Sequence, residues 1–517
     1  MSVSLPNSTL RLAFYGDDFT GSTDALEVLA FAGLRCALFL QVPSRETLAQ
    51  LGPFDAIGVA GDSRAMTPAE MDQHLLPILS AMAELPTSLV HYKVCSTFDS
   101  SPSVGSIGHV IELAQSAFAQ SALAHTSLTQ GAHGASRLSM QAVPIIAATP
   151  ALGRYCVFGH LFARSGIDAR VYRIDRHPIM SVHPVTPMGE ADLVRHLNAQ
   201  APLSISKFEL PSFAVGRDAI DHELNRLLAE GPEAILFDGA EAAHLTETGR
   251  VLHQWAAHTQ GEHGKPLFAV GSSGLEYALT QWWREAKLLP PALPPALPGH
   301  LPDHLPDHLP GHSPGSSLKS TAVVPVSHVL AVSGSASALS ALQIDAALAA
   351  GFVDLPIDAV ALLKTTADTM AALVKRAGDA LAQGQSVMMH TARGPKDERI
   401  KALIDALVDS GQSRNQAKHL GGRQLGQQLG QLVDAILRQH PLQRLLLSGG
   451  DTSSQITRCL APDALQIAAA LSPGAPLCMV LSDQAHLKGL QIALKGGQMG
   501  QADYFVRARD GQSPRQS

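Results

Sequence analysis

Short apolar runs recur through both halves of the chain, and most of them end in Gly, Asp or Ser. Segments whose apolar residues follow helical spacing, such as Thr23–Ala32 and Glu70–Leu85, lie between these runs. Strands that alternate with helices form mostly parallel sheets covered by helices on both faces. The pattern therefore predicts an α/β fold, in which ligands bind beside the carboxyl ends of the strands. The predicted strands lie at residues 10–16, 54–61, 89–94, 143–149, 233–239, 266–272, 326–335, 386–392, 443–450 and 476–483.

One segment, Pro290–Ser317, interrupts this alternation with prolines at four-residue spacing. Such a density of proline excludes a helix or a sheet interior, so the segment is interpreted as an extended linker between two domains. Four histidines in it, at positions 300, 304, 308 and 312, have the spacing of a helical zinc site, but the prolines exclude that helix. A solvated spacer is therefore preferred to a metal site. The predicted domain bounds are 1–288 and 321–517, with the linker at 289–320.

Composition limits the classes of partner that the protein can have. The 517 residues include 38 Lys+Arg and 45 Asp+Glu, a net charge of −7, so the surface has no general attraction for nucleic acid or anionic membranes. Five scattered cysteines form no CxxC pair, which argues against a disulfide framework. No signal peptide and no run of 18 apolar residues is found. These features predict a reduced, soluble, cytoplasmic protein.

The loop after the first predicted strand carries two adjacent carboxylates, Asp17 and Asp18, followed by Gly21-Ser22-Thr23. At a strand-to-helix turn, this arrangement can offer a general base and an amide-rich anion pocket together. In a structural interpretation, Asp17 is a turn residue and Asp18 caps the following helix. Spacing alone leaves both interpretations open.

Further polar groups follow the next predicted strands. Arg64 could grip a substrate carboxylate by two parallel hydrogen bonds, although a structural pair with Asp62 or Asp55 is the favoured alternative. The segment Lys93-Val94-Cys95-Ser96 joins an ammonium to hydroxyl and thiol groups, which suits a small polyhydroxylated anion. Cys95 has no base beside it in the sequence, so it is expected to line the site or pack rather than act as a nucleophile.

A proline-rich segment at 175–188 contains His177 and His183. Histidines in such a loop can serve in catalysis, but a structured loop that closes over the site is an equally good interpretation. The residues do not decide between the two.

Three glycine-rich turns stand out in the second half: 333–337, 448–453 and 495–500. The first two follow predicted strands and open helical patterns, so their backbone amides can approach a phosphate at a helix N-terminus. Asp451 and Thr452 are suited to orient Mg²⁺ or a ribose hydroxyl. Neither a Walker A loop nor a complete GxGxxG fingerprint is present. The turns favour a nucleotide site, but they are also an ordinary way to end a strand.

Taken together, these motifs resemble those of the four-carbon acid sugar kinase family. The matching segments run in order from position 15 to about 505, and they read YGDDFTGSTDALE, GDSRAM, YKVCSTFDSSP with GSIG, HPVTPM, SGSAS, SGGDTSS and KGGQMG. The resemblance implies a substrate domain followed by a nucleotide domain, with an active site in the cleft between them. It also implies transfer of the γ-phosphoryl group of ATP to the 4-hydroxyl of a tetronate, with Mg²⁺. The proline-rich segment departs from the family pattern and looks like a local insertion.

Carried over by position, the resemblance places Asp17 and Asp18 near the reacting hydroxyl. Asp18 is preferred as the base, and the other carboxylate is expected either to cap the helix or to contact the residues that bind the substrate. The acid sugar would be held by Asp17, Arg64, Lys93, Val94, Cys95 and Ser96. The ATP site would be lined by Ser335, Gly449, Gly450, Asp451, Thr452 and Gly496, and no protein-only metal site is expected.

D-threonate or D-erythronate is favoured as the substrate over L-threonate and 3-oxo-tetronate. The expected partners are thus a small sugar acid and ATP, with no nucleic acid and no membrane, and with a homo-oligomer as an open alternative. Two rival functions are kept, an NAD-dependent oxidoreductase of the same acids and a non-catalytic acid-sugar binding protein. The oxidoreductase would need a dinucleotide fingerprint, and the binding protein would leave the glycine turns of the second half without a purpose.

Overall fold

The protein is described by a computed structural model that covers residues 10–126, 142–165, 169–183, 186–289, 323–364, 367–472 and 474–511. It divides into two compact units, which part between residues 293 and 294, and the short segment Ala37–Leu40 is counted with the second unit. The proline-rich segment and its histidines lie outside the described residues, so the predicted linker bounds stay a prediction.

In the first unit, a parallel sheet of seven strands runs in the order β3-β1-β4-β11-β5-β10-β9. A separate antiparallel sheet joins β6, β7 and β8. The elements are β1 Leu12–Gly16, α1 Phe19–Phe31, α2 Arg45–Leu51, β3 Ala56–Ala60, α3 Pro68–Ala83, β4 Leu89–Lys93, α4 Ile107–Thr126, β5 Val143–Ile146, β6 Arg154–Val157, β7 His160–Arg164, β8 Val171–Arg173, α5 Leu193–Asn198, β9 Ile205–Phe208, α6 Arg217–Ala229, β10 Ala234–Phe237, α7 Ala242–His263, β11 Leu267–Gly271 and α8 Gly274–Glu285. The strand β2, Cys36–Phe39, begins in the first unit, and its other residues are counted with the second.

In the second unit, five parallel strands run in the order β13-β14-β12-β15-β18, and β17 and β16 extend the sheet in antiparallel fashion. The elements are β12 Leu330–Ser333, α9 Ala338–Ala349, β13 Val353–Pro356, α10 Ala359–Leu363, α11 Ala367–Ala382, β14 Val387–His390, α12 Glu398–Asp409, α13 Arg414–Gln439, β15 Arg444–Ser448, α14 Gly450–Leu460, β16 Ala464–Ser472, β17 Ala475–Leu481, β18 Gln491–Lys495 and α15 Tyr504–Asp510.

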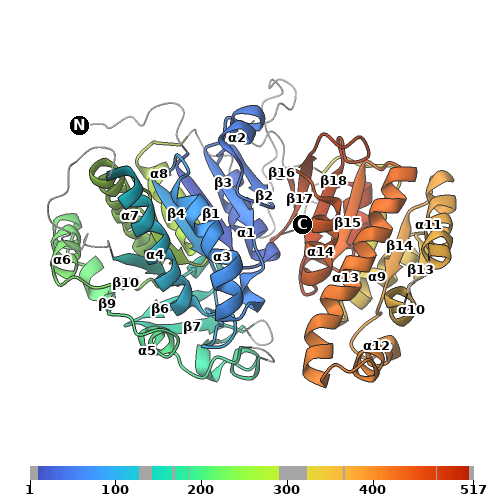
Figure 1. Ribbon diagram of the computed structural model, residues 1–517, viewed down its shortest axis with the longest axis horizontal. Coiled ribbons are helices and arrows are strands. Elements are labelled where there is room, and N and C mark those ends of the chain that lie inside the picture. Colours follow the sequence, from blue (N-terminus) through green and yellow to red (C-terminus); the bar gives the residue numbers. More distant parts are fainter. Residues whose placement is uncertain are drawn as a thin grey trace. The chain divides into compact units, whose positions relative to one another are not determined.

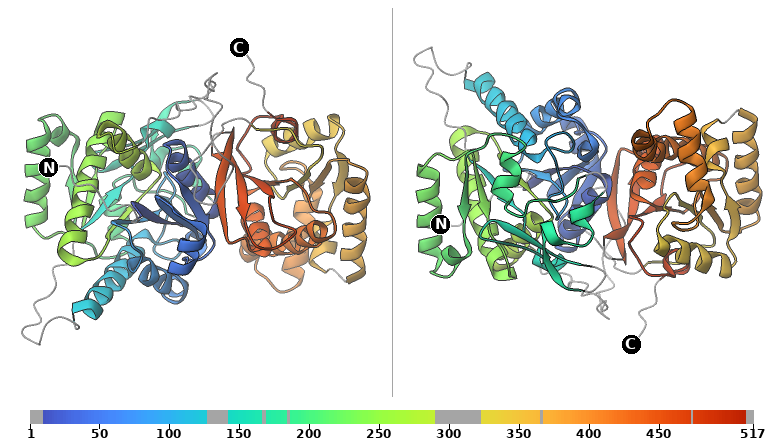
Figure 2. Two further views of the ribbon diagram at one scale, coloured as in Figure 1. Left: turned by 90° about the horizontal axis from the view of Figure 1, so that it is seen from above. Right: turned by 90° about the horizontal axis from the view of Figure 1, so that it is seen from below.

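Helices cover both faces of each sheet, as Figure 1 and the two views of Figure 2 show. Every residue of the central strands β1, β3, β4 and β15 is buried, which explains why these strands are continuous apolar runs rather than alternating ones. In the first unit α1 packs against α8 and α3 against α4; in the second unit α9 packs against α15 and α13 against α14. The predicted α/β fold with two helix-flanked, mainly parallel sheets is confirmed.

The two units share one strand order around their first strands. The order β3-β1-β4-β11 in the first unit matches β14-β12-β15-β18 in the second. Register and backbone bonds match as well: Asp17 N–H donates to Lys93 O at 2.9 Å, and Gly334 N–H donates to Ser448 O at 3.0 Å. In both units the strand order reverses between the two central strands, because the chain continues from them toward opposite edges of the sheet, and such a reversal opens a ligand crevice at the carboxyl ends. The fold therefore marks the β1–β4 edge and the β12–β15 edge as the two places to look for ligands.

Only the first two glycine turns were predicted to follow strands, but the third follows one as well. Lys495 ends the strand β18, so all three turns of the second unit follow strands. The strand begins with Gln491 and ends with Lys495. Only three apolar residues lie between these polar ends, so the sequence did not predict a strand here.

Candidate functional site

At the β1–β4 edge, Arg64 joins the two adjacent carboxylates. It lies in a 3-10 turn, Ser63–Ala65, after β3. Its Nε donates to Asp17 Oδ2 at 2.9 Å, and its Nη2 donates to Asp17 Oδ1 at 2.7 Å and to Asp18 Oδ1 at 2.9 Å. The favoured alternative for Arg64, a pair with Asp62 or Asp55, was wrong, because Asp55 is held by Arg35. The Nε and Nη2 groups of Arg64 thus donate to the two carboxylates, and only Nη1 remains available to bind a substrate carboxylate.

Asp18 is the N-cap of α1. Its Oδ1 accepts from Gly21 N–H at 2.9 Å, while no described group donates to its Oδ2. The capping role thus falls on Asp18, the residue preferred as the base, while Asp17 contacts Arg64 rather than capping the helix. Asp17 has a side chain only 6% exposed, whereas that of Asp18 is 30% exposed. Burial raises the pKa of Asp17 above its usual value, although Arg64 acts in the opposite direction.

Lys93 brings a second cation to the same place. Its side chain is 5% exposed and its ammonium lies 4.0 Å from Asp24 Oδ2. A Cβ on Gly21 would overlap with Asp18 Oδ1 and would lie 2.5 Å from Lys93 Nζ. Glycine at position 21 is therefore what lets the ammonium approach the start of α1.

The residues after Lys93 contribute unequally. Val94 is buried and its N–H donates to Gly271 O at 2.8 Å, so that N–H is not available to a ligand. Cys95 Sγ lies 2.9 Å from Thr97 Oγ1, and burial raises the pKa of the Cys95 thiol. A protonated thiol without a neighbouring base fits a lining role rather than a nucleophilic one. Ser96 lies in the same loop.

A chain of hydrogen bonds links this loop to the proline-rich segment. Thr97 Oγ1 donates to Asp99 Oδ1 at 2.5 Å, Thr186 Oγ1 donates to Asp99 Oδ2 at 3.2 Å, and Thr186 Oγ1 also lies 3.2 Å from His183 Nδ1. His177 is buried and its Nδ1 accepts from the N–H groups of Ile179 and Met180. These contacts favour the interpretation of a structured loop over that of two catalytic histidines.

At the equivalent edge of the second unit, the three glycine turns converge. A Cβ on Gly334 would overlap with Thr452 Oγ1, and one on Gly497 would overlap with Ser335 Oγ. A Cβ on Gly449 would lie 3.3 Å from Ser335 N. The structure therefore brings together Ser335, Gly449, Thr452 and the Gly496–Gly497 turn, which the family resemblance assigned to one site.

The N-terminus of α14 presents backbone N–H groups without a side-chain cap. Its N-cap residue, Gly449, has φ +110°, a conformation that L side chains rarely adopt. Gly450, Asp451 and Thr452 form the first turn, where N–H groups and the helix dipole favour an anion. Three glycines of α13, at positions 422, 426 and 430, make room for α14: a Cβ on Gly422 would contact Asp451 Oδ2 at 3.4 Å, and one on Gly426 would contact Gln455.

Sequence reasoning missed a row of polar residues at the carboxyl ends of three adjacent strands. Ser333, Ser448 and Lys495 are register partners and are all buried. The hydroxyls of both serines have no hydrogen-bond partner among the described residues. Lys495 Nζ donates to Gly496 O at 3.1 Å, and burial lowers the pKa of Lys495 to about 8. The only available signal was that each residue is the last one of an apolar strand.

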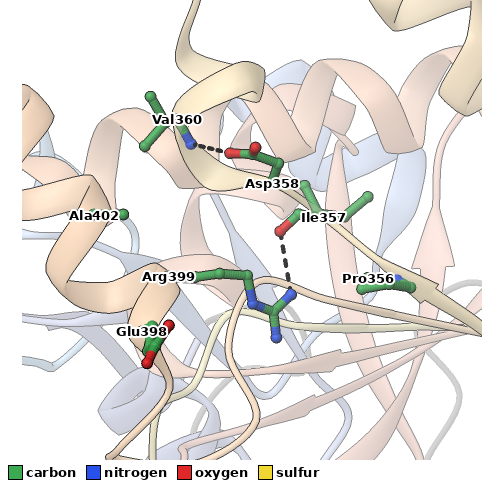
Figure 3. Close-up of a pocket in the computed structure, with 7 residues that line it drawn as sticks. All are labelled: Pro356, Ile357, Asp358, Val360, Glu398, Arg399 and Ala402. Atoms are coloured by element: carbon green, nitrogen blue, oxygen red, sulfur yellow. Dashed lines mark hydrogen bonds between the residues drawn. The ribbon is translucent and has the colours of Figure 1, made fainter.

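A cavity of about 570 Å³ lies at the end of β13, beside the starts of α10 and α12 (Figure 3). Its lining residues are Pro356, Ile357, Asp358, Val360, Glu398, Arg399 and Ala402. The guanidinium of Arg399 binds Asp397 and the carbonyls of Ile357 and His390. None of the residues predicted for either ligand lines this cavity.

Two negative findings concern the described residues only. No cluster of three or more His, Cys, Asp or Glu side chains in them could hold a metal ion. None of their helices is both long and apolar enough to cross a lipid bilayer.

Comparison with known proteins gives matches over nearly the whole chain. Residues 12–279 match the sugar-binding N-terminal domain family, and residues 330–505 match the nucleotide-binding C-terminal domain family. A 3-oxo-isoapionate kinase of Paraburkholderia graminis is 37% identical, with 97% of this chain and 94% of the relative covered. A 3-oxo-tetronate kinase of Pseudomonas savastanoi pv. phaseolicola is 28% identical, with 98% of each chain covered.

Solved structures show the same fold at lower identity. A Salmonella typhimurium protein described as a putative tRNA synthase aligns with TM-score 0.66 at 22% identity, covering 97% of this chain and 98% of its own. A Haemophilus influenzae protein aligns with TM-score 0.62 at 20% identity, covering 96% and 98%. With both domain families matched in order, the chain belongs to the four-carbon acid sugar kinase family.

Proposed function

We propose that this enzyme transfers the γ-phosphoryl group of ATP to the 4-hydroxyl of a four-carbon sugar acid. The observation that carries the proposal is the pair of equivalent sheet edges. One edge holds two carboxylates and two cations around Asp18, and the other holds an uncapped, glycine-rich helix N-terminus at Gly449. Phosphoryl transfer depends on positioning and charge neutralisation more than on covalent chemistry.

In this mechanism, Asp18 is the general base. Its Oδ1 is fixed by the Gly21 amide and by Arg64, so Oδ2 would accept the proton of the attacking hydroxyl. Asp17 positions Arg64 and binds the sugar acid only through that guanidinium. Lys93, the Nη1 of Arg64 and the Cys95–Ser96 segment would hold the acid and its hydroxyls.

The nucleotide would be bound by Ser335, by the turn Gly449–Thr452 and by Gly496. Backbone N–H groups of α14 are suited to phosphate oxygens. Mg²⁺ commonly takes one or two carboxylates together with phosphate oxygens, and Asp451 is the carboxylate placed at this helix start. When bound, the ion would neutralise charge on the phosphates.

Within the substrate class, the names of the relatives favour a 3-oxo sugar acid over D-threonate and D-erythronate. Both named kinases act on 3-oxo acids, and the one at 37% identity covers nearly all of this chain. A 3-oxo group differs from a hydroxyl in accepting hydrogen bonds without donating any. Donors such as Lys93 would suit it.

The test is an ADP-release assay with ATP·Mg²⁺ and a panel of 3-oxo-tetronate, 3-oxo-isoapionate, D-threonate, D-erythronate and L-threonate. Phosphorus NMR of the product would identify the phosphorylated hydroxyl. We expect turnover with at least one acid and a higher kcat/KM for a 3-oxo acid. Binding of an acid without any ADP release would support a non-catalytic binding protein, and reduction of NAD⁺ by an acid would support an oxidoreductase; either would overturn the proposal.

A further inference from the structure

The loop after β11, Gly271–Gly274, was predicted only as a strand end, yet it contains an unusual hydroxyl. Ser273 is 1% exposed, and its Oγ has no hydrogen-bond partner among the described residues. A buried hydroxyl is normally hydrogen-bonded, since removal from water without a partner is unfavourable. An unpartnered one at a strand end therefore points to a ligand.

The loop lies beside the β1–β4 edge. Gly271 is the register partner of Lys93, and Gly271 O accepts from Val94 N–H at 2.8 Å. In the second unit, Lys495 holds the same place: it is the register partner of Ser448, and Lys495 O accepts from Gly449 N–H at 2.9 Å. The β11–α8 loop is thus the counterpart of the glycine turn that approaches Ser335 in the second unit.

The other side chains of the loop are fixed by protein contacts. Ser272 Oγ lies 2.6 Å from Thr149 Oγ1 and accepts from Gly274 N–H at 3.2 Å. A Cβ on Gly274 would overlap with Ala148 O. Beneath the loop, His91 Nδ1 lies 2.7 Å from Glu276 Oε1 and His91 Nε2 lies 3.1 Å from Gly271 O, with both side chains fully buried. The frame around Ser273 is therefore rigid.

Ser273 is also the N-cap residue of α8, a helix of 12 residues, and its side chain makes no cap bond, although Gly274 N–H donates to Ser272 Oγ. The partial positive charge at a helix N-terminus favours an anion, and a serine hydroxyl can donate to it. We infer that Ser273 Oγ and the start of α8 bind the carboxylate end of the sugar acid, which leaves its far hydroxyl toward Asp18. The inference rests on the proposed function for the identity of the ligand.

The decisive variant is Ser273→Ala, which removes only the hydroxyl. We expect KM for the sugar acid to rise by ~10-fold or more, the loss of one hydrogen bond to a charged group, with kcat within about threefold and KM for ATP unchanged. Ser273→Thr keeps a hydroxyl and should restore most of the affinity. The matched control is Thr280→Val on the same helix, whose hydroxyl is satisfied by Glu276 O at 2.7 Å; it should leave KM unchanged.

A KM for the acid within about twofold of wild type in Ser273→Ala would overturn the inference, as would an equal rise in Thr280→Val. If the wild-type enzyme released no ADP with any acid, the proposed function would fail on its own. Calorimetric titration of the same acids without ATP would still test Ser273, because loss of binding in Ser273→Ala alone supports the inference and equal binding refutes it.

Discussion

The guanidinium of Arg64 holds the buried carboxylate of Asp17 through two parallel hydrogen bonds, of 2.9 Å and 2.7 Å. Removal of Arg64 would leave that carboxylate without its partner. Arg64→Ala should lower the free energy of unfolding by about 3 kcal/mol, the lower end for a broken buried pair, because Arg64 itself is 28% exposed. Urea denaturation measures this. The more exposed pair Arg35–Asp55 provides the control, and Arg35→Ala should cost about 1 kcal/mol or less. Equal losses of unfolding free energy in the two variants would show that the burial of Asp17 does not strengthen its pair with Arg64.

Asp18 combines a capping bond with a free carboxylate oxygen, and Asp18→Ser separates the two. Serine caps helices well but cannot accept a proton at neutral pH, so kcat should fall ~10²–10⁴-fold with stability nearly unchanged. Asp18→Ala should lose a further ~1 kcal/mol of stability. Asp192→Ala removes only a cap, that of α5, and should keep wild-type kcat. Near wild-type turnover in Asp18→Ser would show that this carboxylate is not the base.

Gly21→Ala places a methyl group where Asp18 Oδ1 and Lys93 Nζ lie. Alanine usually stabilises a helix by up to ~1 kcal/mol relative to glycine, but here the displaced ammonium should weaken sugar-acid binding, with KM for ATP unchanged. Gly261→Ala in α7, where nothing lies within 4 Å, should show the ordinary gain in thermal stability and unchanged kinetics. Steady-state kinetics and thermal melting of both variants decide the matter; unchanged acid KM in Gly21→Ala would refute the role of this glycine.

Gly449→Ala forces a Cβ onto a residue with φ +110° that faces Ser335 N. Backbone strain of ~1–3 kcal/mol and displaced amides should raise KM for ATP, while calorimetric affinity for the sugar acid stays constant. Asp451→Ala should likewise raise KM for ATP. The control is Gly489→Ala: Gly489 also has a positive φ, +77°, but nothing lies within 4 Å of its added Cβ. This variant should show similar backbone strain and an unchanged KM for ATP. Loss of sugar-acid affinity with retained ATP use would reverse the assignment of the two units.

The buried Lys495 makes the free energy of unfolding depend on pH in the alkaline range. Burial lowers its pKa to about 8, below the usual 10.5, so between these values the unfolded chain binds more protons than the folded one. Stability therefore rises with pH across this window, by up to about 3 kcal/mol for this group. In urea titrations, wild type should gain stability relative to Lys495→Met between pH 8 and 10.5. A difference between wild type and Lys495→Met that stays constant over this pH range would disprove the effect.

Sequence patterns found the central strands because those strands are buried on both faces and are therefore mostly apolar. The N-cap at Asp18 was also predictable, since its Asp-Phe-Thr-Gly context is local. The partner of Arg64 was not predictable, because Asp17 is 47 residues away and only the parallel pairing of β1 with β3 brings the two loops together.

The small sheet β6–β8 and the strand β18 were missed for a different reason. Their residues alternate between buried and partly exposed positions or carry polar ends, so neither forms a long apolar run. Ser273 left no signal at all in the sequence. Its importance depends on a missing hydrogen bond, which exists only in three dimensions.

The common strand order of the two units has a consequence for redesign of this enzyme. The bonds that set each edge, such as Asp17 N–H to Lys93 O and Gly334 N–H to Ser448 O, are made by main-chain atoms. The choice of ligand therefore depends on a few side chains in the loops, which can be changed without altering these main-chain bonds. A library restricted to the loops after β1, β4 and β11 would explore new acid substrates while the second unit and its nucleotide chemistry stay untouched.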